Sequence, residues 1–247
     1  MVVLVGILNL TPDSFSDGGQ FNRVAAAIDH AAQMIADGAA LIDVGAESTR
    51  PNAATLSVRE EWARLEAVLS VLLNKYPGKI SLDTYHPLTV QRAFELGPVI
   101  VNDVTGMNNP AMVETVLELK ARCIISHLPG VTIQVAHKLA PVKSVTEVKQ
   151  DLLARKKALV EKGLPASKII LDPGIGFGKS QELNTQLLSF AEEARDHEVM
   201  IGYSRKRFLG EHRLEIATNL QAGRVAVAAG AKYLRVHDVA GHRQLAR

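Results

Sequence analysis

Eight short runs of apolar and β-branched residues recur along the chain, and this recurrence limits its fold more than any other feature. The runs cover residues 2–8, 40–46, 79–83, 99–103, 123–127, 168–172, 199–204 and 233–237. Most of them are continuously apolar, which is typical of strands that are covered on both faces and therefore of a parallel sheet.

Segments with helical spacing separate these runs. The predicted helices lie at residues 23–38, 57–78, 87–97, 110–120, 144–163 and 216–231. The second of them opens with Ser57 and has Glu60 three residues later, which is the pattern of a capping box. Strands that alternate with helices in this way predict an α/β chain forming a single-domain (β/α)8 TIM barrel over residues 1–247, with a doubly wound open sheet as the alternative.

Composition excludes several classes of partner. The formal net charge of +2 is too small to indicate nucleic acid or a membrane surface as a partner. No apolar run reaches the roughly 18 residues that span a bilayer. We expect no signal peptide, because the first residues lack a basic segment followed by a cleavable apolar one. The single cysteine, Cys123, lies in an apolar segment, which predicts an inert buried thiol. Together these features lead us to expect a cytoplasmic protein. The basic run at 155–157 predicts a solvated helix face.

Each predicted strand leads into polar residues. These are Asn9, Asp43, Asp83, Asn102 with Asp103, His127, Asp172, Ser204 to Lys206, and Arg235 with His237. In a closed barrel the carboxyl ends of the strands meet at one mouth, where barrel enzymes hold their substrates. The sequence therefore predicts a functional site at this mouth.

The mouth combines acceptors with cations. The carboxylate and amide groups of Asp83, Asn102 and Asp172 suit a flat heterocycle with a guanidine-like edge, such as a pterin or guanine. For Asp172 the alternative is that it only shapes the glycine turn that follows it.

Lys206, Arg235 and His237 suit a phosphate group. A diphosphate at this place would need Mg²⁺, for which Asn9 is a suitable oxygen ligand.

A glycine-rich segment, "DPGIGFGK", occupies residues 172–179. Its glycines and lysine do not have the spacing of a Walker phosphate loop. We interpret it as a loop that closely approaches a flat ligand, with Phe177 able to stack on that ligand.

Seven stretches together resemble the dihydropteroate synthase family. They read "GILNLTPDSFSDGG", "IDVGAESTRP", "SLDTYHP", "VNDVTGM", "LDPGIGFGK", "GYSRKRFLG" and "RVHDV", in family order from residue 6 to residue 239. The resemblance implies a TIM barrel and a transferase of folate biosynthesis that sulfonamides target. Such an enzyme joins 6-hydroxymethyl-7,8-dihydropterin diphosphate to p-aminobenzoate, giving 7,8-dihydropteroate and pyrophosphate.

The resemblance also assigns roles to residues at matching motif positions. The implied pterin site consists of Asp83, Asn102, Asp172, Phe177, Gly202 and Lys206. The implied p-aminobenzoate site consists of Pro51, Phe177 and Arg207. The implied pyrophosphate site consists of Asn9, Arg235 and His237, with Mg²⁺ at Asn9. The implied catalytic residues are Asn9, Phe15, Asp17, Thr49, Arg50 and Lys206, with Phe15 and Asp17 acting in a first loop that closes as a lid.

The chain also departs from the family pattern. Leu128 stands where a methionine commonly lines the pterin pocket, and the residues after the eighth strand form only a truncated last helix. Family members are typically dimers joined by their late helices. The resemblance therefore implies a homodimer, and the truncated last helix would shorten its interface. Two alternatives stay open: a non-catalytic pterin-binding paralogue, and a pterin-dependent methyltransferase domain acting on methyltetrahydrofolate.

Overall fold

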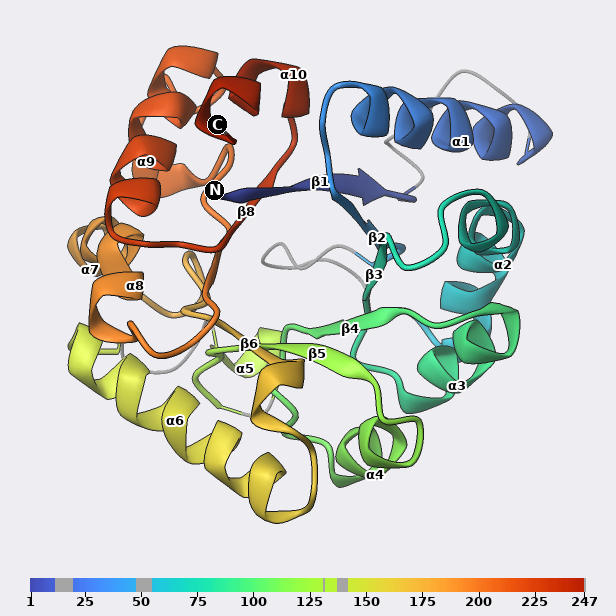
Figure 1. Cartoon of the computed structure of the whole chain (residues 1–247), viewed down its shortest axis with the longest axis horizontal. Helices are drawn as coiled ribbons and strands as arrows, with labels where there is room; N and C mark the ends of the chain where they lie inside the picture. Colours follow the sequence, from blue (N-terminus) through green and yellow to red (C-terminus); the bar gives the residue numbers. More distant parts are fainter. Residues whose placement is uncertain (12–19, 48–54, 131, 137–141, 247) are drawn as a thin grey trace.

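Eight parallel strands form a ring inside a layer of helices in the computed structural model of the chain (Figure 1). The structure describes residues 1–11, 20–47, 55–130, 132–136 and 142–246. The strands are β1 (Val3–Asn9), β2 (Leu41–Gly45), β3 (Ile80–Asp83), β4 (Ile100–Asp103), β5 (Arg122–Ser126), β6 (Ile169–Asp172), β7 (Met200–Ile201) and β8 (Tyr233–Val236).

The ring closes in the order expected of a barrel. Hydrogen-bonded neighbours follow the order β6-β5-β4-β3-β2-β1-β8-β7. The remaining seam, between β6 and β7, is bridged in parallel at Leu171 and Val199, and Leu171 N donates to Glu198 O at 2.9 Å. The (β/α)8 barrel is therefore confirmed, and the open doubly wound sheet is wrong.

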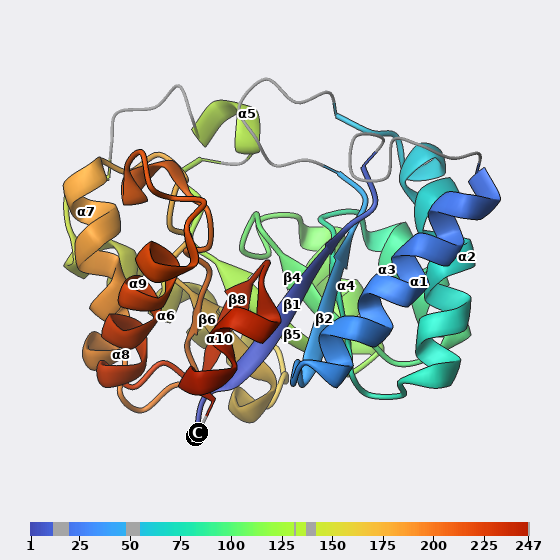
Figure 2. The same cartoon turned by 90° about the horizontal axis from the view of Figure 1, so that it is seen from above.

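Ten helices occur among the described residues, and all but the short one at Ile133–Ala136 lie on the outside of this ring (Figures 1 and 2). They are α1 (Gln20–Ala36), α2 (Val58–Lys75), α3 (Pro87–Leu96), α4 (Pro110–Glu118), α5 (Ile133–Ala136), α6 (Val145–Glu161), α7 (Gln181–Gln186), α8 (Phe190–Glu193), α9 (Ile216–Ala228) and α10 (Val239–His242). All six predicted helices are present, whereas the short helices α7 and α8 between β6 and β7 were not predicted. The truncated last helix is confirmed, since α10 has four residues and a single 3-10 turn, Arg243–Leu245, follows it.

The capping box of α2 is present as predicted. Ser57 N donates to Glu60 Oε2 at 2.8 Å, and Glu60 N donates to Ser57 Oγ at 3.3 Å. These two bonds satisfy main-chain donors that the first helical turn would otherwise leave without partners.

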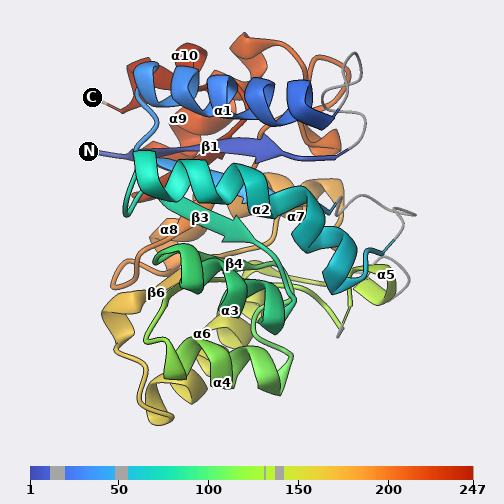
Figure 3. The same ribbon diagram turned by 90° about the vertical axis from the view of Figure 1, so that its right-hand side faces the viewer.

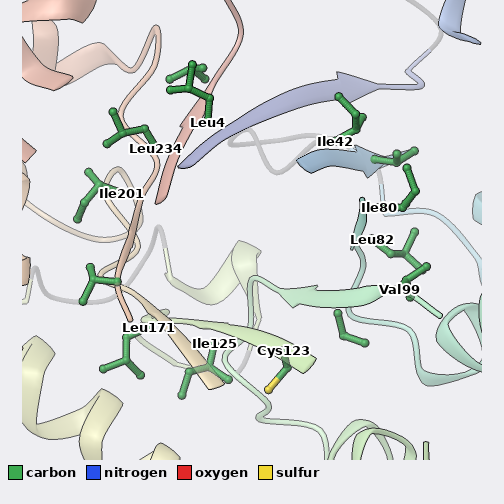
Figure 4. Packing of buried hydrophobic residues seen from close by; sticks show 14 of the residues in the cluster. Leu4, Ile42, Ile80, Leu82, Val99, Cys123, Ile125, Leu171, Ile201 and Leu234 are labelled. Carbon is green, nitrogen blue, oxygen red and sulfur yellow. The ribbon is translucent and has the colours of Figure 1, made fainter. Parts of the chain in front are cut away.

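Apolar side chains form two layers, one on each face of the sheet. The outer layer lies between strands and helices and includes Leu4, Ile42, Ile125, Leu171 and Leu234, which point away from the ring in Figure 4. The inner layer fills the barrel and consists of Val5, Leu41, Ile100, Ile124, Ile170, Met200 and Tyr233. Adjacent residues such as Leu4 and Val5 thus belong to opposite layers, as the period of two in a strand requires.

The same alternation aims the polar strand ends into the barrel. Asp43 lies two residues after the interior Leu41, and Arg235 lies two residues after the interior Tyr233. Asn102, Asp172 and Gly202 stand in the same relation to Ile100, Ile170 and Met200. The interior of the barrel therefore changes from apolar to polar within two residues along these strands, and the polar residues form the mouth.

The two ends of the barrel differ. Both termini lie at the end where β1 begins, whereas α5 lies beyond the carboxyl ends of the strands (Figures 2 and 3). None of the helices in the described part of the chain combines the length and apolar character that crossing a bilayer requires. The predicted solvated face at 155–157 is wrong for two of its three residues, because Arg155 is half-buried and Lys156 is buried.

Cys123 is buried between the strands and the helices, as its apolar setting predicts (Figure 4). Burial raises the pKa of the Cys123 thiol to about 12, so the reactive thiolate is scarce at ordinary pH.

We expect iodoacetamide to leave Cys123 of the native protein unlabelled at pH values near 8 and to add one label in urea, as measured by mass spectrometry. Rapid labelling of the native protein would contradict this placement.

Candidate active site

Arg235 lies at the centre of the polar mouth and joins two strands across it. Its Nε donates to Asp43 Oδ2 on β2 at 2.6 Å, and its Nη2 donates to Asp83 Oδ2 on β3 at 2.7 Å. Asp43 is fully buried, while Arg235 and Asp83 are partly exposed. A guanidinium has five N–H groups, so Arg235 keeps donors for a further acceptor.

Asp43 also determines the orientation of Asn102 on β4. Asn102 Nδ2 donates to the same Asp43 Oδ2 at 3.0 Å. Because an ionised carboxylate only accepts hydrogen bonds, the amide nitrogen must face Asp43 and the amide oxygen is left as the free acceptor. Asn102 therefore presents an acceptor, beside the carboxylate of Asp83.

Opposing effects set the protonation of these groups. Burial raises the pKa of Asp83 to about 7, and the Arg235 guanidinium opposes that shift. Burial raises the pKa of Asp172 as well, with the positive charge of Lys206 acting against it. Burial lowers the pKa of Lys206 to about 8, which Asp172 opposes. Perturbed groups of both signs at one mouth are typical of functional sites.

The glycine-rich loop after β6 brings Asp172, Phe177 and Lys206 together. Gly174 N donates to Asp172 Oδ1 at 2.7 Å, so Asp172 shapes the turn and still has its second oxygen. Lys206 Nζ donates to Ile175 O at 2.5 Å and lies 5.4 Å from the centre of the Phe177 ring. The turn-shaping alternative for Asp172 and its place in the mouth are thus compatible.

Gly202 fits between two of these groups. A Cβ atom at this position would lie 3.8 Å from Asp172 Oδ2 and 3.8 Å from Arg235 Cβ. The absence of a side chain therefore leaves the space between β6 and β8 open toward the mouth.

His237 and Asn9 lie at the ends of β8 and β1. His237 Nδ1 is 3.0 Å from Ser204 Oγ, which ties the end of β8 to the segment after β7. Asn9 is paired in register with Gly45 of β2. Among the described residues no hydrogen bond or ion pair of the Asn9 side chain is formed, so its amide oxygen is available to a ligand.

The structure brings together most of the predicted site residues that it describes. Asp83, Asn102, Asp172, Phe177, Gly202, Lys206 and Arg235 share the mouth through the contacts given above. Arg207 lies next to Lys206 but is exposed, in the 3-10 turn Arg207–Leu209. Phe15, Asp17, Thr49, Arg50 and Pro51 lie outside the described residues, so their roles stay predictions.

Three charged residues have partners that the sequence did not predict. Asp43, which the sequence placed at the mouth as a strand-end carboxylate, bonds both Arg235 and Asn102. Arg155 Nη1 donates to Thr105 O at 3.0 Å and Gly106 O at 3.1 Å in the loop after β4. The third is Lys179, which bonds main-chain carbonyls of the loops after β5 and β6.

Replacing Asp43 tests its part in this network. We expect Asp43→Asn to lower the free energy of unfolding by about 1.5–3 kcal/mol, because the Arg235 guanidinium loses a charged, buried acceptor. Urea denaturation followed by circular dichroism measures this, with Asp29→Asn on the exposed face of α1 as the matched control. Equal effects of the two substitutions would contradict the role of Asp43.

Comparison with known proteins agrees with this geometry. The family model described as pterin binding enzyme matches residues 5–237. A dihydropteroate synthase of Escherichia coli (strain K12) is 36% identical over 245 residues, covering 96% of this chain and 86% of the relative.

Two solved structures of Xanthomonas albilineans dihydropteroate synthase are also similar. The one with 4-aminobenzoic acid has a TM-score of 0.89 and 35% identity, covering 99% of this chain and 91% of the other. The one in complex with 7,8-dihydropteroate has a TM-score of 0.86 and 33% identity, covering 99% of this chain and 90% of the other. The chain belongs to the pterin binding enzyme family, and within that family to the dihydropteroate synthases.

Proposed function

We propose that the mouth of this barrel catalyses the dihydropteroate synthase reaction, joining 6-hydroxymethyl-7,8-dihydropterin diphosphate to p-aminobenzoate. The observation that carries this proposal is the meeting of three acceptor side chains with two cations at one mouth. The acceptors are Asp83, Asn102 and Asp172, and the cations are Lys206 and Arg235. The similar Xanthomonas structures, with 4-aminobenzoic acid and with 7,8-dihydropteroate, support the same substrates here.

The acceptors account for recognition of the pterin. A pterin carries adjacent N–H donors on its guanidine-like edge, and carboxylate and amide oxygens bind such an edge in fixed directions. Asn102 would present its oxygen to the pterin, because its amino group donates to Asp43 on the other side. Phe177, beside Lys206, supplies an aromatic face at the edge of the mouth, where the p-aminobenzoate ring would lie next to Arg207.

The cations account for the leaving group. As the C–O bond between the pterin methylene and the diphosphate breaks, negative charge develops on the diphosphate. Arg235 retains N–H donors for this charge, and His237 lies two residues further along the same chain segment. Groups already in place for a developing charge lower the barrier without reorganising.

The amine of p-aminobenzoate then forms the new C–N bond and loses a proton. Water competes with the amine for the electron-poor methylene carbon, so the site must exclude it. We assign this exclusion to the first loop, with Phe15 and Asp17, and to the second loop, with Thr49, Arg50 and Pro51.

Mg²⁺ fits this site in the chemistry of its donors. Mg²⁺ takes oxygen ligands and usually binds through one or two protein groups together with substrate phosphates. Asn9 has an amide oxygen available at the end of β1 and would hold the ion. When bound, Mg²⁺ would neutralise charge on the diphosphate. A homodimer and a cytoplasmic location likewise stay predictions from the resemblance.

Pyrophosphate release tests the reaction. We expect release from the dihydropterin diphosphate to require both p-aminobenzoate and Mg²⁺, and EDTA to abolish it. Lys206→Ala should lower kcat/KM by about 10- to 100-fold, because a charge-assisted contact is lost in the mouth. Lys157→Ala, a lysine exposed on α6, is the matched control and should behave as wild type.

The alternatives give different results in this assay. Pterin binding without pyrophosphate release would identify a non-catalytic paralogue. Methyl transfer from methyltetrahydrofolate, with no need for p-aminobenzoate, would identify a methyltransferase domain.

A further inference from the structure

Lys179 ends the glycine-rich segment, yet its ammonium ion turns back into the protein. Its Nζ lies 2.9 Å from Gly174 O, 3.0 Å from Phe177 O and 3.2 Å from His127 O. An ammonium ion has three N–H donors, and here three carbonyl acceptors surround it. No donor is left for a phosphate, which gives a structural reason why this segment is not a phosphate loop.

These three carbonyls belong to two loops that are pressed together. A Cβ atom at Gly174, which has φ +64°, would lie 2.1 Å from His127 O, and one at Gly178 would lie 2.5 Å from Pro129 Cγ. Carbonyl oxygens that converge on one point repel each other unless a donor or a cation lies between them. Lys179 supplies both, and so joins the loop after β5 to the loop after β6.

The residues that Lys179 holds flank those assigned to the substrates. Gly174, whose carbonyl binds Lys179, donates its own N–H to Asp172 Oδ1 at 2.7 Å. Phe177, whose carbonyl also binds Lys179, lies under the Lys206 ammonium. Lys206 in turn donates a hydrogen bond to the carbonyl of Ile175, which lies between Gly174 and Phe177 in the chain. Lys179 therefore contacts the main chain on both sides of the point where Lys206 contacts it.

We propose that Lys179 is a positioning residue for both substrates: its ammonium ion holds the loop so that Asp172 and Phe177 keep the places that pterin and p-aminobenzoate require. This inference rests on the proposed synthase function and deepens it. The hydrogen bonds of Lys179 within the described residues all go to main-chain carbonyls.

The charges around Lys179 make its effect depend on pH. Burial lowers the pKa of Lys179 to about 7, Asp172, Asp151 and Glu147 oppose this, and Lys206 reinforces it. His127 is also close, but burial lowers its pKa to about 3, so it stays neutral. A neutral amine has two N–H donors for three carbonyls, and its hold on the loop is weaker.

Steady-state kinetics of Lys179→Met test the proposal. We expect KM to rise about tenfold for both substrates, as for the loss of a charge-assisted hydrogen bond, while kcat changes much less. The ratio of mutant to wild-type KM should decrease as the pH rises through about 7, because the wild-type ammonium ion loses its charge there. Lys168→Met is the matched control, because Lys168 Nζ also bonds a main-chain carbonyl, that of Lys120, away from the mouth.

Chemical rescue separates positioning from general stability. Lys179→Ala removes the atoms of n-propylammonium, so this ion should restore KM in a saturable way. Tetramethylammonium has the charge but no N–H donor and should not restore it. Without substrates, Lys179→Met should speed amide hydrogen exchange in residues 172–178 and leave α2 unchanged.

The outcomes separate this proposal from the proposed function. A wild-type protein that releases no pyrophosphate would overturn the synthase assignment, while hydrogen exchange would still report on the hold of Lys179 on the loop. Substrate KM values and exchange rates that match those of Lys168→Met would overturn the positioning role. Equal rescue by both ions, or an effect on kcat alone, would also overturn it.

Discussion

The common direction of the eight strands decides where the functional side chains of this protein lie. After each strand the chain runs back along the outside of the barrel and begins the next strand at the same end. All carboxyl ends therefore lie together at the mouth. Because every second residue of a strand faces the barrel interior, the interior-facing positions change from apolar residues to polar ones as the strand reaches the mouth. Leu41 followed by Asp43, and Tyr233 followed by Arg235, are two instances of that change.

Charges in such a mouth are costly to bury and need partners. Arg235 has two carboxylates, Lys206 has a carbonyl oxygen of the glycine-rich loop, and Lys179 has carbonyl oxygens of that loop and of His127. Arg235 and Asp83 are also groups that a substrate would engage. A pterin diphosphate brings N–H donors for Asp83 and an anion for Arg235, so it carries both kinds of partner that these two side chains give each other.

Much of this could be predicted from sequence because the signals are local. The apolar runs, the helical spacing, the capping box at Ser57 and the buried Cys123 depend on residues near in the chain. The motif positions of Asp83, Asn102, Asp172 and Lys206 also identified side chains that the fold brings to one place. The short helices α7 and α8 were missed because neither extends beyond six residues, too few for a periodic pattern to appear.

What the sequence by itself determined was the order of strands and helices, and hence which residues stand at strand ends. Only the tertiary structure decided which of those residues contact each other. Asp43 and Arg235 are 192 residues apart in the chain, and their bond exists because β2 and β8 both flank β1 in the closed ring. The sequence predicted a solvated face for Arg155 and no partner for Lys179, whereas in the structure neighbouring loops supply carbonyl partners to both. The physical reason is that periodicity reports the face on which a side chain lies, whereas a hydrogen bond needs a specific partner that the folded chain alone brings within reach.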